Sequence, residues 1–327
     1  MFEICGFKVE KGTKAHLNME YTKDIAGDPI GMPFTVINGV EEGPVLLLDG
    51  CVHGDEPEGP LAIIKIINQV DPQKLRGTII AIPAINSLAL ASGKRGNPRD
   101  EHNYDLNRIY PGKPDQFVTG RLAYKHFTEI LQKANMEISV HGGGNHSFMI
   151  PAIFNNGSPE SLELVKAMGP DWSISMKNLG NASPQGQARP FGIASINAEI
   201  GGTSGAHPDL LNKNVNILVN AFYNVMYHYK MLEGTPKYRD HWYVGHQDTV
   251  YAEADGMLMP GDIEFKLGQM VEEGEPLLKL VNLRGETVQI AKAPAPGIPF
   301  GLHTYPSVCT GEWMVFLAHV ERVEELV

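Results

Sequence analysis

Short apolar runs that end at glycine, proline or histidine recur through the first two-thirds of the chain, and segments of helical period separate them. Residues 45–49 are followed by Gly50, residues 78–83 end at Pro83, and residues 138–140 are followed by His141. Apolar runs this short are typical of strands buried on both faces. The segments of helical period cover residues 58–70, 119–133 and 210–232.

This alternation predicts the fold class. A helix that connects two neighbouring strands over one face of a sheet leaves those strands parallel, so the order predicts an α/β fold with helices flanking a mixed, mostly parallel sheet. Residues 193–200 supply a further strand of this kind. Because ligands bind beyond the carboxyl ends of parallel strands, we expect the functional residues there.

The pattern changes after about residue 236. From His241 onward no helical period is evident, and glycine recurs between short alternating runs such as 276–281. Such runs predict strands. We therefore expect two domains, an α/β domain over residues 1–236 and a small all-β, barrel-like domain over residues 237–327.

Charge and cysteine content exclude several classes of protein. The 327 residues include 27 Lys and Arg against 38 Asp and Glu, a net charge of −11, so nucleic acid is not an expected partner. Three dispersed cysteines allow neither a disulfide framework nor a zinc site made of cysteine. No apolar stretch approaches the ~20 residues of a membrane span, so we expect a cytoplasmic protein without a membrane partner.

The most informative motif follows the first buried strand, where His53 and Glu56 stand three residues apart. An imidazole and a carboxylate that share one centre suit a borderline ion such as Zn²⁺. Alone this spacing is a weak signal, because a histidine at a strand end is more often structural. His141 at another strand end predicts a third ligand in the same crevice. His146 competes for that role, and His141 is preferred because it follows the strand directly.

Glu199 interrupts a further strand-like run just before Gly201 and Gly202. Beside a metal-activated water, its carboxylate could accept a proton and return it to a leaving amine. A structural glutamate in a salt bridge is the alternative on this segment alone.

Another polar segment contains Asn107 and Arg108 in the run D-L-N-R. The fixed fork of an arginine suits a carboxylate or a developing oxyanion, and the asparagine amide could share that role. Arg95 and Arg99 lie upstream in a polar loop, and either could reach a substrate. Taken singly, each of these two arginines is slightly better explained as a solvated loop residue.

Taken together, the motifs resemble the succinylglutamate desuccinylase/aspartoacylase family of the zinc carboxypeptidase clan. Four motifs stand in the family's order over residues 40–235, which makes the resemblance specific. They are the H-x-x-E of His53 and Glu56, the later His141, the D-L-N-R-x-x-P-G of residues 105–112 and the A-E-x-G-G around Glu199.

The resemblance implies a carboxypeptidase-like fold and roles for particular residues. It implies one Zn²⁺ ion per subunit, held by His53, Glu56 and His141. It also implies that Glu199 is the general base and acid. In the same way, Arg108 is expected to polarise the scissile carbonyl and Asn107 to help orient the substrate.

Two departures from many relatives concern the substrate more than the metal. Ser139 stands two residues before His141, where an aspartate is common. The stretch before D-L-N-R is slightly expanded, which leaves open whether Arg95 or Arg99 binds substrate.

The C-terminal region resembles the lipoyl/biotinyl-type barrel that such family members append. Neither Lys279 nor Lys292 stands at the turn of residues 281–287, where a carrier domain has its modified lysine. A covalently attached cofactor is therefore not expected. We interpret the region as structural, either forming one wall of the cleft or mediating assembly into a homo-oligomer.

The expected activity is zinc-dependent removal of an acyl group from an N-acyl amino acid or a related small amide. The V-H-G-G-G segment and the barrel-like tail are closer in appearance to deacetylases of N-acetylated diamino acids than to aspartoacylase itself. Three alternatives stay open: a metallocarboxypeptidase, a lactam or ester hydrolase on the same centre, and a non-catalytic binding module.

Overall fold

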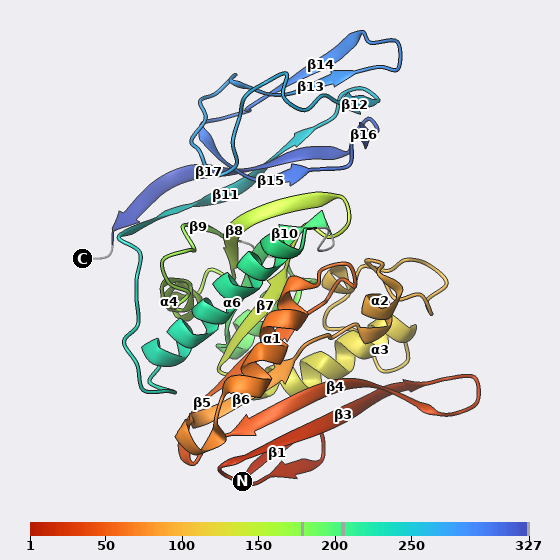
Figure 1. Ribbon diagram of the computed structural model, residues 1–327. Helices are drawn as coiled ribbons and strands as arrows, with labels where there is room; N and C mark the ends of the chain where they lie inside the picture. Colours follow the sequence, from red (N-terminus) through yellow and green to blue (C-terminus); the bar gives the residue numbers. More distant parts are fainter. Residues whose placement is uncertain (178–179, 204–206, 326–327) are drawn as a thin grey trace.

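The structure, a computed structural model, describes residues 1–177, 180–203 and 207–325 and contains a long mixed sheet with helices on both faces (Figure 1). Eleven strands form this sheet in the order β15-β17-β11-β9-β8-β10-β7-β5-β6-β4-β3. Strands β14, β13, β12 and β16 form a second sheet, and β1 pairs with β2. The α/β class with a mixed sheet and a β-rich C-terminal region is therefore confirmed.

The elements have the following bounds. The strands are β1 (Phe2–Ile4), β2 (Phe7–Val9), β3 (Thr13–Lys23), β4 (Pro29–Asn38), β5 (Glu41–Gly50), β6 (Arg76–Ile82), β7 (Met136–His141), β8 (Ser147–Asn155), β9 (Ile174–Lys177), β10 (Ala194–Gly202), β11 (His241–Tyr251), β12 (Gly256–Leu258), β13 (Pro276–Val281), β14 (Thr287–Lys292), β15 (Gly297–His303), β16 (Ser307–Val308) and β17 (Trp313–Glu325). The helices are α1 (Glu58–Gln69), α2 (Ser87–Ser92), α3 (Val118–Lys125), α4 (Pro159–Ala167), α5 (Pro184–Ala188) and α6 (Pro208–His228).

The centre of the long sheet is parallel. Strand β5 pairs in parallel with β6 on one side and with β7 on the other, and β7 pairs in parallel with β10. The carboxyl ends of β5, β7 and β10 therefore lie side by side. The residues that follow or end these strands, which include the predicted site residues, meet at one edge of the sheet.

Helices α1, α4 and α6 cover one face of the sheet, and α3 and α5 lie over the other. In α1 the inward face is formed by Ile63, Ile66 and Ile67, whereas Leu61 and Ile64 are 40% and 44% exposed. The helical period of residues 58–70 thus predicts the helix but does not identify its buried face. The alternative stripe contains more apolar residues per turn, and it is the stripe that packs on the sheet.

Two predicted helices are shorter than their periodicity indicated. Regular α-helix in the segment 119–133 is limited to α3, and a wider π-helical turn at residues 126–130 follows it. That turn contains the buried His126, whose Nδ1 lies 2.8 Å from the hydroxyl oxygen of Tyr110. The predicted helix 210–232 ends at His228 in α6.

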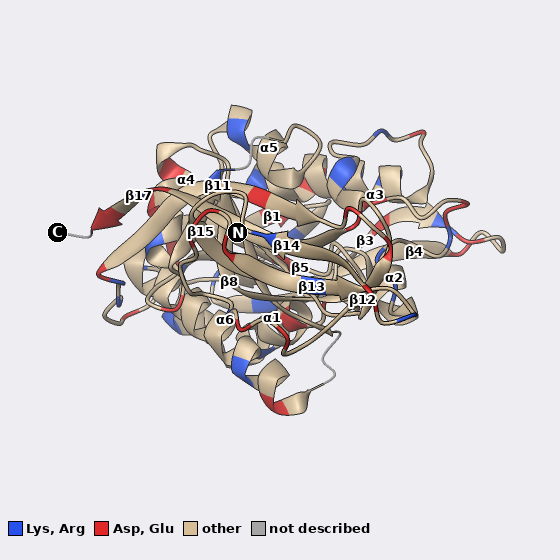
Figure 2. Ribbon diagram, turned by 90° about the horizontal axis from the view of Figure 1, so that it is seen from above, with Lys and Arg blue, Asp and Glu red and all other residues tan. Residues whose placement is uncertain are grey.

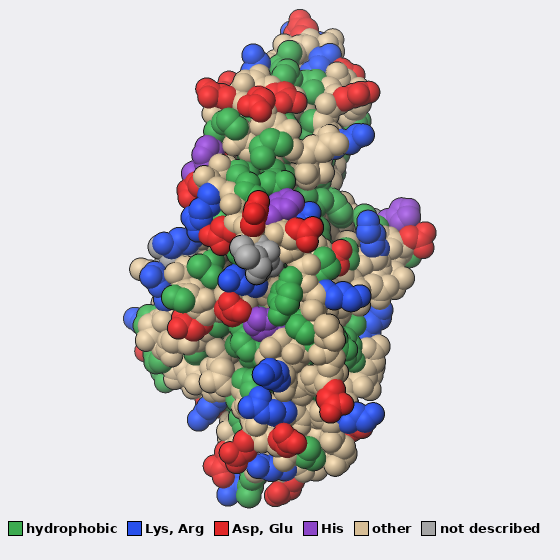
Figure 3. All heavy atoms as spheres, turned by 90° about the vertical axis from the view of Figure 1, so that its left-hand side faces the viewer, with side chains coloured by type: hydrophobic (Ala, Val, Ile, Leu, Met, Phe, Trp, Pro, Cys, Tyr) green, Lys and Arg blue, Asp and Glu red, His purple; other side chains and the backbone are tan. Residues whose placement is uncertain are grey.

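The C-terminal region is all-β throughout its described residues, 241–325. Three of its strands continue the long sheet, because β11 pairs in parallel with β9, and β15 pairs with both β17 and β8. The four-stranded sheet lies beyond them, and in the space-filling view this end is narrower than the body below it (Figure 3). A domain boundary near residue 236 stays a prediction.

Acidic and basic residues are spread over many elements instead of gathering on one (Figure 2). Among the described residues, no helix is both long and apolar enough to cross a membrane.

Candidate metal centre and catalytic groups

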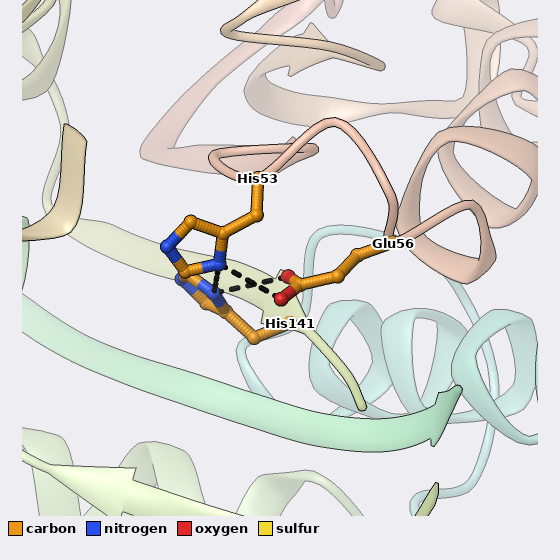
Figure 4. Close-up of side chains that lie close together, drawn as sticks. All are labelled: His53, Glu56 and His141. Carbon is orange, nitrogen blue, oxygen red and sulfur yellow. Dashed lines mark hydrogen bonds and ion pairs between the residues drawn. The ribbon is translucent and has the colours of Figure 1, made fainter. Parts of the chain in front are cut away.

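Three side chains from two neighbouring strand ends converge on one point (Figure 4). His53 and Glu56 belong to the turn between β5 and α1, and His141 ends β7. Nδ1 of His53 lies 2.8 Å from Oε1 of Glu56, and Nδ1 of His141 lies 3.2 Å from Oε2 of the same carboxylate. The structure thus brings together the three predicted metal ligands, all of them buried.

Close backbone packing holds this turn in place. A Cβ atom on Gly54 would lie 2.1 Å from the carbonyl carbon of Ala89, so the turn between His53 and Glu56 requires glycine at this position. Gly59, in the first turn of α1, packs against Val140, the residue before His141. Both histidines are therefore fixed relative to each other by glycines that permit close approach.

The arrangement fits a divalent cation. The two Nδ1 atoms of His53 and His141 face each other at 3.3 Å, and Oε2 of Glu56 is buried without a hydrogen bond within the described structure. Two imidazole nitrogens and a carboxylate at such separations are the donor set of a zinc-type site.

A carboxylate outside the cluster orients one of its histidines. Oδ1 of Asp105 lies 3.0 Å from Nε2 of His53, on the opposite side of the ring from Glu56. Metal-binding histidines commonly donate their second N–H to such a carboxylate, which fixes the tautomer. Burial works to raise the pKa of Asp105, but His53 and Arg95 outweigh it and hold that pKa well below its usual range. Asp105 is part of the D-L-N-R motif, yet sequence reasoning did not assign it this role.

The same contacts determine which groups of the cluster are protonated when no metal is bound. Burial works to raise the pKa of Glu56, but His53 and His141 lower it to about 2. Burial works to lower the pKa of His53, but Glu56 and Asp105 raise it to about 9. In the absence of a metal, His53 therefore carries the proton that a metal ion would displace.

Glu199 stands directly beside His141, because the two residues are in register on the parallel strands β10 and β7. Burial raises the pKa of Glu199 to about 7, partly opposed by the charge of His141 and increased by that of Glu56. A carboxylate with a pKa near neutrality is suited to both accepting and donating a proton.

The end of β10 is shaped by Glu58, a residue that sequence reasoning missed. Oε1 of this buried glutamate accepts a hydrogen bond of 2.9 Å from the backbone N–H of Gly202. Gly201 and Gly202 have φ angles of +79° and +132°, which favour glycine, and the β10–β8 register shifts between Glu199 and Gly201. Glu58 thereby anchors the irregular strand end that carries Glu199.

The arginines differ in position. Arg95 reaches the cluster: its Nη2 lies 2.9 Å from Oδ2 of Asp105, and its Nη1 lies 3.7 Å from Oε1 of Glu56. Arg99 is exposed, and its charge acts on Tyr21. Arg108 is also exposed, and its Nη1 donates a hydrogen bond to the backbone oxygen of Asn107.

Asn107 and His146 complete the set of predicted residues. Asn107 is buried beside Asp105, and its side-chain oxygen has no hydrogen bond within the described structure. His146 is exposed, lies outside the cluster and packs edge-on against Tyr305 at a ring distance of 5.2 Å.

Strands β5, β7 and β10 also carry a strip of buried polar side chains inside the sheet, before the strand ends that hold the cluster. Asp49 pairs with Ser139 across β5 and β7, and Glu137 pairs with Ser195 across β7 and β10. Both carboxyl groups are fully buried, and burial raises the pKa of each. The hydroxyl of Ser195 donates a hydrogen bond to Glu137. Ser139 therefore places a neutral hydroxyl opposite the Asp49 carboxyl of the next strand.

Comparison with known proteins shows the family of the chain. The family model for the succinylglutamate desuccinylase/aspartoacylase catalytic domain matches residues 42–223, more than half of the chain. The chain belongs to this family. The matched range includes all of the clustered residues described above.

A curated relative is the N-alpha-acetyl-L-2,4-diaminobutyric acid deacetylase of Halomonas elongata. It is 29% identical over 269 residues, which are 77% of this chain and 74% of the relative.

Two solved structures share the fold along nearly the whole chain. The product-bound ectoine utilization protein EutE (DoeB) from Ruegeria pomeroyi has a TM-score of 0.83 at 23% identity, over 96% of this chain and 97% of its own. A succinylglutamate desuccinylase/aspartoacylase from Rhodobacter sphaeroides has a TM-score of 0.82 at 22% identity, over 97% of this chain and 98% of its own. These likenesses extend over the C-terminal β-rich region as well as over the range that the family model matches.

Proposed function

We propose that this protein is a zinc-dependent amidohydrolase that removes the acyl group from an N-acyl amino acid or a closely related small amide. The observation that carries the proposal is the convergence of His53, Glu56 and His141 with Glu199 in register beside them. Membership of a family that contains deacylases supports the reaction class.

In this proposal His53, Glu56 and His141 hold one Zn²⁺ ion per subunit. The ion, when bound, supplies Lewis-acid chemistry by activating water and polarising the substrate carbonyl. Asp105 holds the His53 ring with Nδ1 directed at the centre, through the 3.0 Å contact to Nε2. The protein's contribution here is a fixed, buried donor set that needs little rearrangement to receive the ion.

Glu199 is assigned the proton transfers. Its carboxylate accepts a proton from the attacking water and then returns it to the departing amine nitrogen, so no net proton is consumed by the enzyme. Burial of Glu199 next to His141 keeps both protonation states accessible near neutral pH.

Arginine and asparagine side chains are assigned to the substrate. We retain Arg108 as the residue that polarises the scissile carbonyl and Asn107 as its partner in orienting the substrate. Arg95 is favoured over Arg99 as an additional substrate arginine, because its guanidinium lies within 3.7 Å of Glu56. An anionic carboxylate of an amino-acid product is the group such an arginine would bind.

We further propose that residues 1–236 form the catalytic domain and residues 237–327 a non-lipoylated β-module that lines one side of the cleft. Supporting this, the backbone N–H of Thr304 donates a 2.7 Å hydrogen bond to the carbonyl oxygen of His146, in the loop after the ligand His141. A cytoplasmic location is proposed with it, because all three cysteines are unpaired.

The proposal is tested with a substrate panel. Protein stripped with a chelator and protein reloaded with Zn²⁺ are compared on N-acetyl and N-succinyl amino acids, N-acetylated diamino acids, peptides with free C-termini, a lactam and an ester. We expect hydrolysis of at least one N-acyl amino acid, only by the reloaded protein. Turnover of peptide C-termini alone would favour a carboxypeptidase, and no turnover by metal-loaded protein would contradict the proposal.

A further inference from the structure

A second cluster of histidine and carboxylate side chains lies on the strand pair β11 and β17, in a part of the sequence that the catalytic proposal does not use. His246 on β11 is directly opposite His319 on antiparallel β17. Their rings lie 4.8 Å apart at an angle of 31°. Asp248, two residues along β11, projects from the same face of the sheet because strand side chains alternate.

The ligand atoms of these three residues are already close to one another. Nε2 of His246 lies 3.6 Å from Oδ1 of Asp248, and Nδ1 of His319 lies 3.8 Å from Oδ2 of Asp248. One donor atom from each of the three lies within 4.8 Å of the others. A cation coordinated at about 2.0–2.2 Å from nitrogen and oxygen needs donor separations somewhat shorter than this, within reach of small side-chain rotations.

The other nitrogen of His246 is held in place. Its Nδ1 lies 2.8 Å from Oε1 of Glu321, which leaves Nε2 facing Asp248. This is the arrangement in which a carboxylate behind a histidine fixes the tautomer and ring orientation of a metal ligand. On the paired strands, Val244 is opposite Arg322 and Gly245 is opposite Val320. Glu321, between the two partners on β17, is therefore the extra residue of a β-bulge.

One further observation indicates a ligand, and a second explains how the two strands lie so close together. Nδ1 of His319 is buried and has no hydrogen bond within the described structure, although it faces Asp248. A Cβ atom on Gly245 would lie 1.7 Å from the carbonyl oxygen of His319, so the strands approach this closely only with glycine there. The bulge and the glycine together bring Glu321 behind His246 and bring β11 close to His319, whose Nδ1 has no hydrogen bond within the described structure.

We propose that His246, His319 and Asp248 form a second site for a divalent transition-metal ion, with Glu321 orienting His246. Two imidazoles and one carboxylate select ions of the zinc type over Mg²⁺ or Ca²⁺, which prefer oxygen donors. The site is independent of the catalytic proposal, since it shares no residue with the first centre. A bound ion would link β11 to β17, which are neighbours in the long sheet.

Zn²⁺ alone is the probe. The H141A variant removes a ligand of the first centre, so binding at the second site can be measured separately. Chelator-stripped protein is titrated with Zn²⁺ by calorimetry and equilibrium dialysis at pH 7.5. We expect wild-type protein to bind two ions per chain, H319A one, H141A one and H141A/H319A none. H241A is the matched control, because His241 also lies on β11 but outside the cluster, and it is expected to bind two.

A second readout covers the case in which alanine disturbs the sheet. H319Q keeps the size of the side chain, and saturating Zn²⁺ is expected to raise the unfolding temperature of H141A but not of H141A/H319Q. Equal ion counts for wild type and both His319 variants would overturn the proposal, as would a single ion in wild type that H141A loses. Retention of both ions by H141A would instead count against the first centre, so the two proposals fail separately.

Discussion

Glu199 on β10 is in register with His141 on β7. The pairing puts the carboxylate of β10 next to a candidate metal ligand. Parallel pairing of β7 and β10 produces this neighbourhood, so the sheet itself fixes the proposed proton-transfer group beside the candidate metal centre. The catalytic account depends on that relationship.

The E199Q variant tests the role of Glu199. The amide has nearly the same shape as the carboxylate but cannot accept a proton at neutral pH, so we expect kcat to fall by about 10²–10⁴-fold with Zn²⁺ still bound. Steady-state kinetics and metal analysis measure the two effects. E233Q, which changes an exposed glutamate in the segment after α6, is the control and is expected to be unaffected. Near-normal turnover by E199Q would show that another group transfers the proton.

The D105N variant tests the orientation of His53. Asparagine cannot offer the same charged acceptor to Nε2 of His53 and to Arg95, so we expect Zn²⁺ affinity to fall by about 10–100-fold. Competition with a chromophoric chelator measures the dissociation constant. The matched control is D115N, which changes an exposed aspartate. An unchanged Zn²⁺ affinity would assign Asp105 a purely structural role.

Lysine replacements distinguish the arginines. Lysine keeps the charge but loses the two-pronged geometry, so R95K and R108K are expected to lower kcat/KM by about 10-fold or more, whereas R99K stays within about twofold. The panel substrate with the highest turnover serves for all three variants. A loss confined to R99K would reverse the choice between Arg95 and Arg99, and an unaffected R108K would remove Arg108 from the carbonyl.

The buried pair of Asp49 and Glu137 predicts how stability depends on pH. Burial raises the pKa of both groups above their values in the unfolded chain, so the folded state holds more protons than the unfolded state. The contribution of this pair to the free energy of unfolding is therefore expected to be largest below about pH 4. It should fall as the pH rises toward neutrality.

The D49N variant checks this. An uncharged amide removes the ionisation of one partner, so the contribution of the pair to the pH dependence between about pH 4 and 8 should become flatter. Urea unfolding of metal-free protein at several pH values measures it. A variant whose pH dependence matches that of wild type would contradict the assignment of raised pKa values to this pair.

Much of the site could be predicted from the sequence because its residues stand at strand ends. Once the strands at 45–49, 138–140 and 193–200 are parallel neighbours, His53, His141 and Glu199 must meet, whatever the details of the loops. The short apolar runs carried that information locally. The length and glycine content of the turn after β5 further limited where Glu56 could lie.

Other features depend on contacts that are distant in sequence. Strands β3 and β4 at the sheet's far edge were not predicted, and neither was the continuation of the long sheet into β11 and β17. Arg95 and Arg99 look alike in sequence. What separates them is the path of the loop, where the N–H of Gly54 donates a hydrogen bond to the carbonyl oxygen of Arg95.

The buried carboxyl pair of Asp49 and Glu137 also depends on contacts that are distant in sequence. Asp49 stands at the end of one apolar run and Glu137 directly before another, and neither position indicates that the two share one polar strip. Only the register of β5 on β7 places Asp49 opposite Ser139.

The central claim, a metal-dependent reaction at His53, Glu56 and His141, is tested most directly by one paired measurement. Metal content per chain and hydrolysis of the best N-acyl amino acid are determined for wild-type protein and for H141A, prepared identically and checked for folding by circular dichroism. The account predicts that H141A contains one ion fewer per chain and has lost hydrolysis by orders of magnitude. Equal metal content in the two proteins, or undiminished hydrolysis by H141A, would contradict it.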